Sequence, residues 1–269
     1  MDEQLLAVIV GVVQGVLEWL PVSSEGTVAL VLNLLGNADP GAAVQFALFL
    51  HAGTALAATV YYRDEIGDVL WTLPDLSADD PFGEGTADVS FLIVATLSSM
   101  VVGLAAYTAL EALVSELAGG AFVALIGGLL VVTGIVQKVA ESRGGIDRRT
   151  EPDLVDALAV GVLQGLAILP GVSRSGTTVS ALLLRGHEGV ESLRLSFLLA
   201  IPASLGAGLL SFEGLGMAPT AAVTALAVSA VVGYLTVGAL VALVRRVAFW
   251  GVCVGFGTLA LVGGGLLLL

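Results

Sequence analysis

Long apolar runs alternate with short polar segments along the whole chain. A helix needs about 20 apolar residues to cross a membrane, and five runs reach that length. A sixth run, Ala248–Leu269, ends the chain. The pattern therefore predicts an all-α, polytopic membrane protein rather than a soluble domain. The five long runs are Ala42–Tyr62, Asp88–Leu110, Ala118–Ala140, Leu193–Phe212 and Pro219–Val244.

Two further apolar regions are interrupted by a proline that is followed closely by serine. The first is broken at Pro21–Ser24 and the second at Pro170–Ser173. At about 1.5 Å per residue, the piece after each break is too short to span a membrane. We therefore predict two re-entrant hairpins, because non-helical backbone survives in a membrane only inside protein or beside a water-filled cavity. The half-helices are Leu5–Leu20 with Thr27–Leu35, and Leu154–Leu169 with Thr177–Leu184.

Composition supports this prediction and excludes several classes of protein. Of the 269 residues, 57% are hydrophobic and 12% are charged, against about 25% charged in soluble domains. The mean hydropathy is +1.00. These values exclude a nucleic-acid-binding protein, a disordered chain and an ordinary soluble enzyme. The single cysteine, Cys253, cannot form a disulfide within the chain.

The few basic residues lie almost entirely on one side of the predicted topology. If both broken regions turn back, nine of the ten Lys and Arg fall on one side, and the tenth, Arg174, lies inside the second break. Cytoplasmic loops carry the excess of Lys and Arg. We therefore expect a multi-pass protein of the cell membrane with both termini outside the cytoplasm. The nine residues are Arg63, Lys138, Arg143, Arg148, Arg149, Arg185, Arg194, Arg245 and Arg246.

The acidic residues outnumber the basic ones, 23 against 10, which gives a net charge of −13. Either the acids bind a cation or the loops are adapted to high salt. Nine arginines against a single lysine, Lys138, favour adaptation to salt. His187 stands beside Glu188 in a predicted loop, so we expect its side chain to be solvated.

The two broken regions repeat one another without a gap when the sequence is shifted by 150 residues. Gly11–Gly15 aligns with Gly161–Gly165, and Val22–Thr27 aligns with Val172–Thr177. The matched Gln, Ser, Gly and Thr positions argue against a chance similarity between two segments rich in Gly and Val. The chain is therefore predicted to contain an internal repeat.

This repeat predicts the domain organisation. We expect a single membrane domain over residues 1–269, made of repeat one (1–141) and repeat two (151–269). Each half is a re-entrant hairpin followed by three transmembrane helices. Because three crossings is an odd number, the second half must be inverted relative to the first. Inverted repeats place their binding site near the bilayer midplane, where the broken helices meet.

The residues of the second break are suited to bind an anion. Pro170 and Gly171 end one helix and Ser173 is placed to cap the next, so the first N–H groups of that helix face the turn, as in phosphate sites. Arg174 adds a planar, permanent positive charge. The first break repeats this plan. The two breaks are therefore expected to hold a single anion between them. The candidate binding residues are Ser23, Gly26, Thr27, Ser173, Ser175, Gly176 and Thr177.

Glu18 and Ser24 are candidates for the chemistry beside Arg174. A charge at the bilayer centre costs roughly 2.5–3.5 kcal/mol, so we expect Glu18 and Arg174 to share one polar cavity. A purely structural ion pair between the hairpins is the alternative. Ser24 stands at the repeat position that matches Arg174, opposite the guanidinium, where its hydroxyl either attacks a bound phosphorus or only caps a helix.

These residues resemble signatures of the undecaprenyl-pyrophosphate phosphatase family of the bacitracin-resistance type. Its E-G-x-x-E-F-L-P-V-S-S-x-G-H motif stands here as Gln14–Thr27, and its P-G-x-S-R-S-G-x-T motif is complete as Pro170–Thr178. The resemblance extends over the whole chain. It implies a hydrolase that converts a polyprenyl diphosphate to the monophosphate and phosphate for lipid-carrier recycling. It also implies that Ser24 is the nucleophile, that Arg174 holds the diphosphate, and that Glu18 assists or binds a divalent cation, Mg²⁺ or Ca²⁺.

The sequence departs from that family at two positions. Gln14 replaces the first glutamate and Thr27 replaces the histidine, and neither residue takes a proton near neutral pH. Three residues are alternatives for the missing base: Glu18 itself, Glu25, and His51 from the third helical piece. A buried structural histidine is the alternative for His51.

Two other functions use the same anion site. The first alternative is a polyprenyl-phosphate flippase or carrier, which needs no general base. The second, weaker one is an ion-coupled transporter of a soluble anion. The expected partners are a polyprenyl diphosphate lipid and the membrane, without nucleic acid, and the sequence specifies no oligomeric state.

Overall fold

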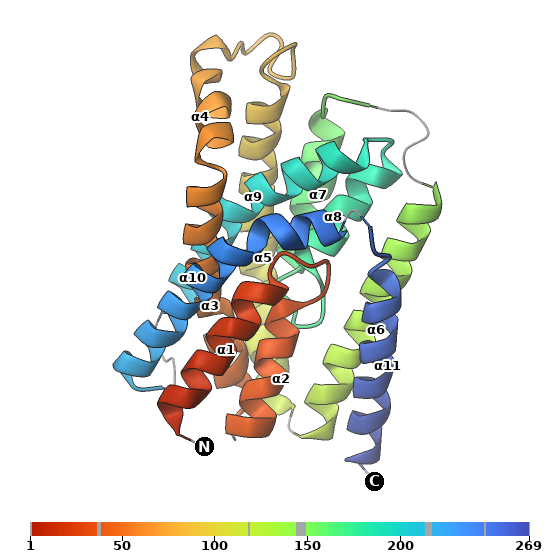
Figure 1. Cartoon of the computed structure of the whole chain (residues 1–269). Helices are drawn as coiled ribbons and strands as arrows, with labels where there is room; N and C mark the ends of the chain where they lie inside the picture. Colours follow the sequence, from red (N-terminus) through yellow and green to blue (C-terminus); the bar gives the residue numbers. More distant parts are fainter. Residues whose placement is uncertain are drawn as a thin grey trace.

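The computed structural model describes residues 2–36, 39–117, 119–143, 149–212, 217–244 and 246–268. Over these ranges the chain forms α-helices and one short 3₁₀ turn, Leu73–Asp75, and contains no β-strand (Figure 1). The helices are α1 (Glu3–Leu17), α2 (Ser24–Gly36), α3 (Pro40–Tyr61), α4 (Arg63–Trp71), α5 (Ala87–Glu116), α6 (Gly120–Arg143), α7 (Leu154–Leu166), α8 (Arg174–Leu184), α9 (Gly189–Leu210), α10 (Pro219–Val244) and α11 (Trp250–Leu266).

Five of these helices are long and apolar enough to cross a membrane: α3, α5, α6, α9 and α10. They correspond to the five long runs of the sequence, so the prediction of an all-α, multi-pass membrane protein is confirmed. The sixth predicted run, Ala248–Leu269, forms only the 17 residues of α11, about 25 Å of helix. This helix is shorter than predicted because it begins after the turn that ends at Phe249, and it lies along α6 (Figure 1).

The two broken regions form helix hairpins, α1 with α2 and α7 with α8. Ser23 Oγ accepts a hydrogen bond from the N–H of Gly26, and Ser173 Oγ accepts one from the N–H of Gly176, each at 3.1 Å. Both serines are therefore N-caps. Gly171 has φ +105°, which only glycine adopts without strain, and its N–H donates to Ser23 Oγ at 3.0 Å. Ser23 thus joins the two breaks.

The first helix of each hairpin packs closely against a span of the other half, α1 along α10 and α7 along α5. A Cβ added to Gly15 would lie 2.9 Å from the backbone N of Gly233, and one added to Gly165 would lie 2.8 Å from that of Gly103. Both approaches therefore require glycine. The helices α3 with α9 and α6 with α11 also pair. Each of these pairs joins helices that two related halves would bring together. That one half is inverted relative to the other stays a prediction.

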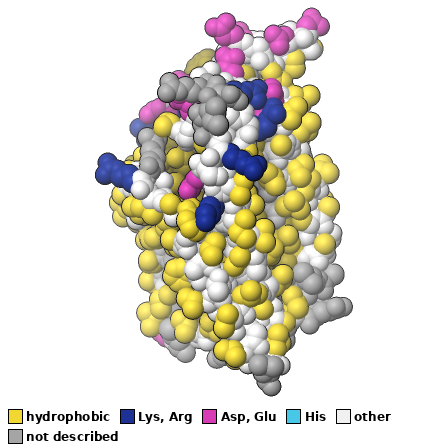
Figure 2. All heavy atoms as spheres, turned by 90° about the vertical axis from the view of Figure 1, so that its right-hand side faces the viewer, with side chains coloured by type: hydrophobic (Ala, Val, Ile, Leu, Met, Phe, Trp, Pro, Cys, Tyr) yellow, Lys and Arg dark blue, Asp and Glu magenta, His cyan; other side chains and the backbone are white. Residues whose placement is uncertain are grey.

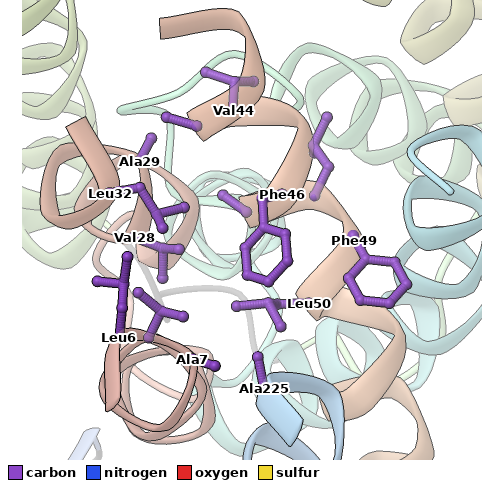
Figure 3. Close-up of a cluster of buried hydrophobic side chains, with 14 of the residues drawn as sticks. Leu6, Ala7, Val28, Ala29, Leu32, Val44, Phe46, Phe49, Leu50 and Ala225 are labelled. Atoms are coloured by element: carbon purple, nitrogen blue, oxygen red, sulfur yellow. The ribbon is translucent and has the colours of Figure 1, made fainter. Parts of the chain in front are cut away.

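Helix α3 runs through the interior of the bundle. In this helix 72% of the residues of the apolar window are buried inside the bundle, against 17% in α10, so α10 lies at the periphery. Figure 3 shows Leu6 of α1, Val28 of α2 and Ala225 of α10 gathered around Phe46 and Leu50 of α3, and all five are buried. This apolar packing holds the first hairpin against α3 and α10.

The two ends of the bundle differ in charge. Both chain termini lie at one end (Figure 1), and on the face that Figure 2 shows the Lys and Arg side chains gather toward the opposite end. This arrangement agrees with the partition of basic residues along the sequence. Arg148 and Arg245, two of the nine residues in that partition, lie outside the described residues.

The expectation of a solvated His187 is wrong. The residue is completely buried, and because a carboxylate only accepts, its Nε2 donates to Asp156 Oδ2 at 3.0 Å. The turn after α8 folds over the start of α7, where the backbone N–H of Arg149 also donates to the carbonyl of Gly186 at 2.9 Å. A charged partner at the start of α7 thus draws the histidine inward, and the local sequence around His187 does not reveal that partner.

Candidate functional site

The breaks of the two hairpins enclose a small cavity of about 20 Å³, enough for one water molecule. The predicted catalytic residues Glu18, Ser24 and Arg174 all line it, and they come from different hairpins. The full lining is Glu18, Val22, Ser23, Ser24 and Glu25 from the first hairpin, His51 from α3, and Ala167, Val172, Arg174 and Ser175 from the second hairpin.

Glu18 is at the centre of the hydrogen bonds in this cavity. Its side chain is buried, and its Oε2 accepts from Ser24 Oγ and from Gln14 Nε2, both at 2.8 Å. Its Oε1 pairs with Arg174 Nη2. The carboxylate therefore contacts both the candidate nucleophile and the candidate anion-binding arginine. Gln14 stands where the family has its first glutamate, and its amide orients the Glu18 carboxylate.

Arg174 is held from two sides. Its Nη2 pairs with Glu18, and its Nη1 donates to the carbonyl of Ala200 and to Ser204 Oγ, each at 2.9 Å. Both of these acceptors lie on α9. The guanidinium is therefore fixed at the start of α8 and aimed across the gap between the hairpins. This rigidity suits a group that must bind a phosphate in one orientation.

His51 reaches the site from α3. Its Nδ1 lies 2.9 Å from the carbonyl of Ala47, and because a carbonyl only accepts, Nδ1 carries the hydrogen. In the neutral ring, Nε2 is then the basic atom, and it lies 3.5 Å from Glu18 Oε2. The backbone of α3 thus selects the tautomer that accepts a proton inside the cavity.

Glu25 also lines the cavity, and its Oε1 has no hydrogen-bond partner. Burying a carboxylate without a partner is expensive, so the group requires a proton or a cation. Within the described ranges, no group of three or more His, Cys, Asp or Glu could hold a metal ion. Mg²⁺, however, is usually bound by one or two carboxylates together with substrate phosphates. The pair of Glu18 and Glu25 fits that mode of binding.

Five of the predicted binding residues do not line the cavity. The N–H groups of Gly26 and Gly176 are occupied by the serine caps, and the hydroxyls of Thr27 and Thr177 each donate to a backbone carbonyl of the preceding turn at 2.9 Å. These groups build the two helix starts, whose positive ends face the cavity, and they present no free donor. The five residues are Gly26, Thr27, Ser173, Gly176 and Thr177.

A larger cavity of about 440 Å³ adjoins the small one and shares Glu25, His51 and Arg174 with it. Its outer part is apolar and includes Met100 and Leu209, which are 63% and 77% exposed on the surface of the bundle. A third cavity, of about 350 Å³, shares only one lining residue with the small cavity. The larger cavity is therefore the broader connection from the charged site to the apolar surface of the bundle.

Sequence reasoning missed the polar residues that complete this larger cavity. Ser204 holds Arg174, and Gln164 and Ser99 face one another across α7 and α5. Gln164 was recognised only as one of the matched positions of the repeat. One signal could have pointed to Gln164: its counterpart in the repeat, Gln14, stands inside the first motif of the family.

Comparisons with known proteins show which family this chain is similar to. The family model described as bacitracin resistance protein BacA matches residues 7–260. A protein of Haloarcula marismortui named undecaprenyl-diphosphatase is 58% identical over 98% of both chains. Proteins with the same name from Methanopyrus kandleri and Nocardioides sp. are 41% and 34% identical, over 95% and 99% of this chain and 94% and 99% of their own lengths. The Haloarcula relative also fits the interpretation of the acidic loops as an adaptation to salt.

Proposed function

The chain belongs to the BacA bacitracin resistance family, and on that premise we propose that it is a membrane hydrolase that converts undecaprenyl-type diphosphate to the monophosphate and inorganic phosphate. One observation carries the proposal. Ser24, Glu18 and Arg174 form a continuous chain of contacts between two helix N-termini. A nucleophile bonded to a base, beside a fixed positive charge, is the arrangement that phosphoryl transfer requires.

The geometry supports a two-step reaction. Ser24 Oγ attacks the terminal phosphorus and its proton passes to Glu18. The bond from that phosphorus to the bridging oxygen breaks, and Glu18 gives the proton to that oxygen as the lipid monophosphate leaves. Water then cleaves the serine phosphate, releases inorganic phosphate and restores Ser24. Glu18, ionised again, or His51 Nε2 accepts the proton of that water and passes a proton to Ser24 Oγ as the phosphate leaves. His51 is thus a candidate for the base that Thr27 cannot supply.

The pair between Glu18 and Arg174 couples proton transfer to charge stabilisation. In the structure, Glu18 pairs with Arg174 and neutralises it. When the carboxylate takes the Ser24 proton it becomes neutral, and the guanidinium is released to stabilise the negative charge of the transferring phosphoryl group. This coupling gives a functional reason for two energetically expensive charges to stand together inside the membrane. A purely structural ion pair gives no such reason.

A divalent cation, Mg²⁺ or Ca²⁺, is part of the proposal. Glu18 and Glu25 would hold it together with the diphosphate oxygens, and when bound it neutralises charge on the diphosphate. The unpartnered Oε1 of Glu25 supports this assignment. The lipid tail leaves through the larger cavity, and the basic end of the bundle faces the cytoplasm, so that both termini lie outside.

The decisive experiment measures phosphate release from undecaprenyl diphosphate by the purified protein in detergent, with and without Mg²⁺ or Ca²⁺, at low and high salt. We expect release that depends on a divalent cation. Lipid movement across liposomes without any phosphate release would instead favour the flippase. The names of the relatives support hydrolysis, and no observation favours transport.

A further inference from the structure

The larger cavity contains a polar pair that the reaction above does not use. Gln164 of α7 and Ser99 of α5 both line it, and both are buried. Gln164 Nε2 donates to Ser99 Oγ at 3.3 Å, and Gln164 Oε1 has no hydrogen-bond partner. Buried polar groups are nearly always paired, above all where no water can reach them. The amide therefore retains hydrogen-bonding capacity for a ligand.

The matching glutamine of the first hairpin has a different donor contact. Gln14 Nε2 donates to Glu18, four residues later in the same hairpin, and Gln14 Oε1, like Gln164 Oε1, has no hydrogen-bond partner. The residue four positions after Gln164 is Ile168, whose side chain accepts no hydrogen bond. The amide of Gln164 therefore contacts a neutral hydroxyl of another helix and is not committed to a carboxylate.

The backbone fixes this amide relative to the cavity. Helix α7 approaches α5 so closely at Gly165 that a Cβ there would lie 2.8 Å from the N of Gly103 and 2.9 Å from the O of Ser99. Ser99 Oγ donates to the carbonyl of Thr96 at 2.9 Å, so it accepts from Gln164 and orients the amide. One N–H of the amide is then held by Ser99 and the other is free.

The position of the pair suggests its ligand. The cavity that contains it also contains Arg174 and His51 at its inner end and the lipid-exposed Leu209 at its outer end. A lipid diphosphate whose terminal phosphorus lies at Ser24 must place its second phosphate toward this cavity, because the tail leaves through it. A neutral amide suits that phosphate, since it donates to an anion without adding charge.

We propose that Gln164 binds the phosphate that stays on the lipid, and that Ser99 is the positioning residue for its amide. This inference rests on the proposed function, because it concerns the second phosphate of the same substrate. The free N–H of Gln164 donates to an oxygen of that phosphate, and Oε1 accepts from a water or a protonated phosphate oxygen. The same contact holds the lipid monophosphate before it leaves, so the product inhibits the enzyme through Gln164.

Gln164→Leu tests the proposal, because leucine keeps most of the volume and removes the amide. We expect KM for undecaprenyl diphosphate and the inhibition constant of undecaprenyl monophosphate both to rise about tenfold, as for the loss of one hydrogen bond to a charged group, with kcat nearly unchanged. Hydrolysis of p-nitrophenyl phosphate, which has no second phosphate, should be unaffected. Ser99→Ala should raise the same two constants about threefold.

Ser98→Ala is the matched control, because the Ser98 hydroxyl donates to the carbonyl of Val94 within its own helix at 2.9 Å and does not line the cavity. Unchanged KM and inhibition constants in Gln164→Leu, or equal losses on both substrates, would overturn the proposal. If that variant does not fold, Gln164→Asn and Ser99→Ala carry the same comparison. Equilibrium binding of undecaprenyl monophosphate to the protein and to Gln164→Leu tests the contact even if the protein releases no phosphate.

Discussion

The two hairpins share one backbone plan and carry different chemistry. In both, a serine caps the second helix and a glycine lets the first helix pack closely against the other half. The first hairpin supplies Glu18 and Ser24, the proposed base and nucleophile, whereas the second supplies Arg174 and has Ile168 where the first has Glu18. The repeat therefore supplies two facing helix N-termini, and substitution at a few matched positions divides the roles between them.

The hairpins also differ in what anchors them. Asp156, at the start of α7, is completely buried, and its carboxylate accepts from Arg185 Nε at 2.6 Å and from His187. Asp153 caps the same helix in a capping box with Asp156. The matching residue of Asp156 in the first hairpin is Leu6, which lies in the apolar core of Figure 3. One hairpin is thus anchored by ion pairs and the other by apolar packing.

Ser24→Ala tests the first half of this division and should give the largest effect. Loss of a nucleophile removes the covalent step, and kcat should fall at least about 10⁴-fold. Binding of undecaprenyl monophosphate should stay within about threefold of the unsubstituted protein, because the proposed anion contacts, Arg174 of α8 and Gln164 of α7, both belong to the second hairpin. Parallel kinetic and equilibrium-binding measurements check both expectations. Substantial phosphate release from Ser24→Ala would remove Ser24 as nucleophile and leave the anion site in place.

Arg174→Ala tests the second half of the division. We expect kcat/KM to fall about 10³-fold, and, in contrast to Ser24→Ala, lipid monophosphate should also bind much more weakly. Arg174→Lys should recover only part of the loss, since an ammonium cannot contact Glu18 and α9 together as the planar fork does. Full activity in Arg174→Ala would refute the site assignment.

The sequence alone indicates the two breaks and that Glu18 and Arg174 share one cavity, for physical reasons. Proline and serine at a break, and charge inside an apolar run, are local signals that few structures can accommodate. The roles of Gln14 and His187 could not be predicted this way. Gln14 acts through Glu18 one turn away, and His187 through Asp156, which lies 31 residues earlier. Their chemistry depends on partners that only the folded chain brings near.

Asp156→Asn tests the ion-pair anchor of the second hairpin. Removing one member of a fully buried ion pair costs about 3 kcal/mol or more. Arg185 and Arg149 are 36% and 32% exposed and solvent screens them, so the free energy of unfolding should fall by about 1–2 kcal/mol while the folded fraction keeps its kcat. Thermal unfolding in detergent, followed by phosphate release at low temperature, checks both quantities. Asp64→Asn is the control, because its pair with Arg63 is exposed and should contribute almost nothing. Equal decreases in the free energy of unfolding of the two variants would contradict the ion-pair anchor.

The anchor should also make stability depend on pH, with the smallest effect of the series. Burial raises the pKa of Asp153, but hydrogen bonds from Arg149 and from the N–H of Asp156 outweigh it and hold the pKa below its ordinary value of 3.8. A lowered pKa means that the folded protein resists protonation, so this stabilisation is complete above pH 3.8 and is lost as the pH falls through the folded value.

Thermal unfolding between about pH 3 and pH 6 should therefore show a steeper acid loss in the unsubstituted protein than in Asp153→Asn, which keeps the helix cap and cannot titrate. The difference should be small, because the Asp153 side chain is 41% exposed and solvent screens its pairs. Arg149→Gln should flatten the acid limb as well, because it removes the hydrogen bond that lowers the pKa of Asp153. If stability falls with decreasing pH at the same slope in all three proteins, the second hairpin, like the first, is anchored mainly by apolar packing.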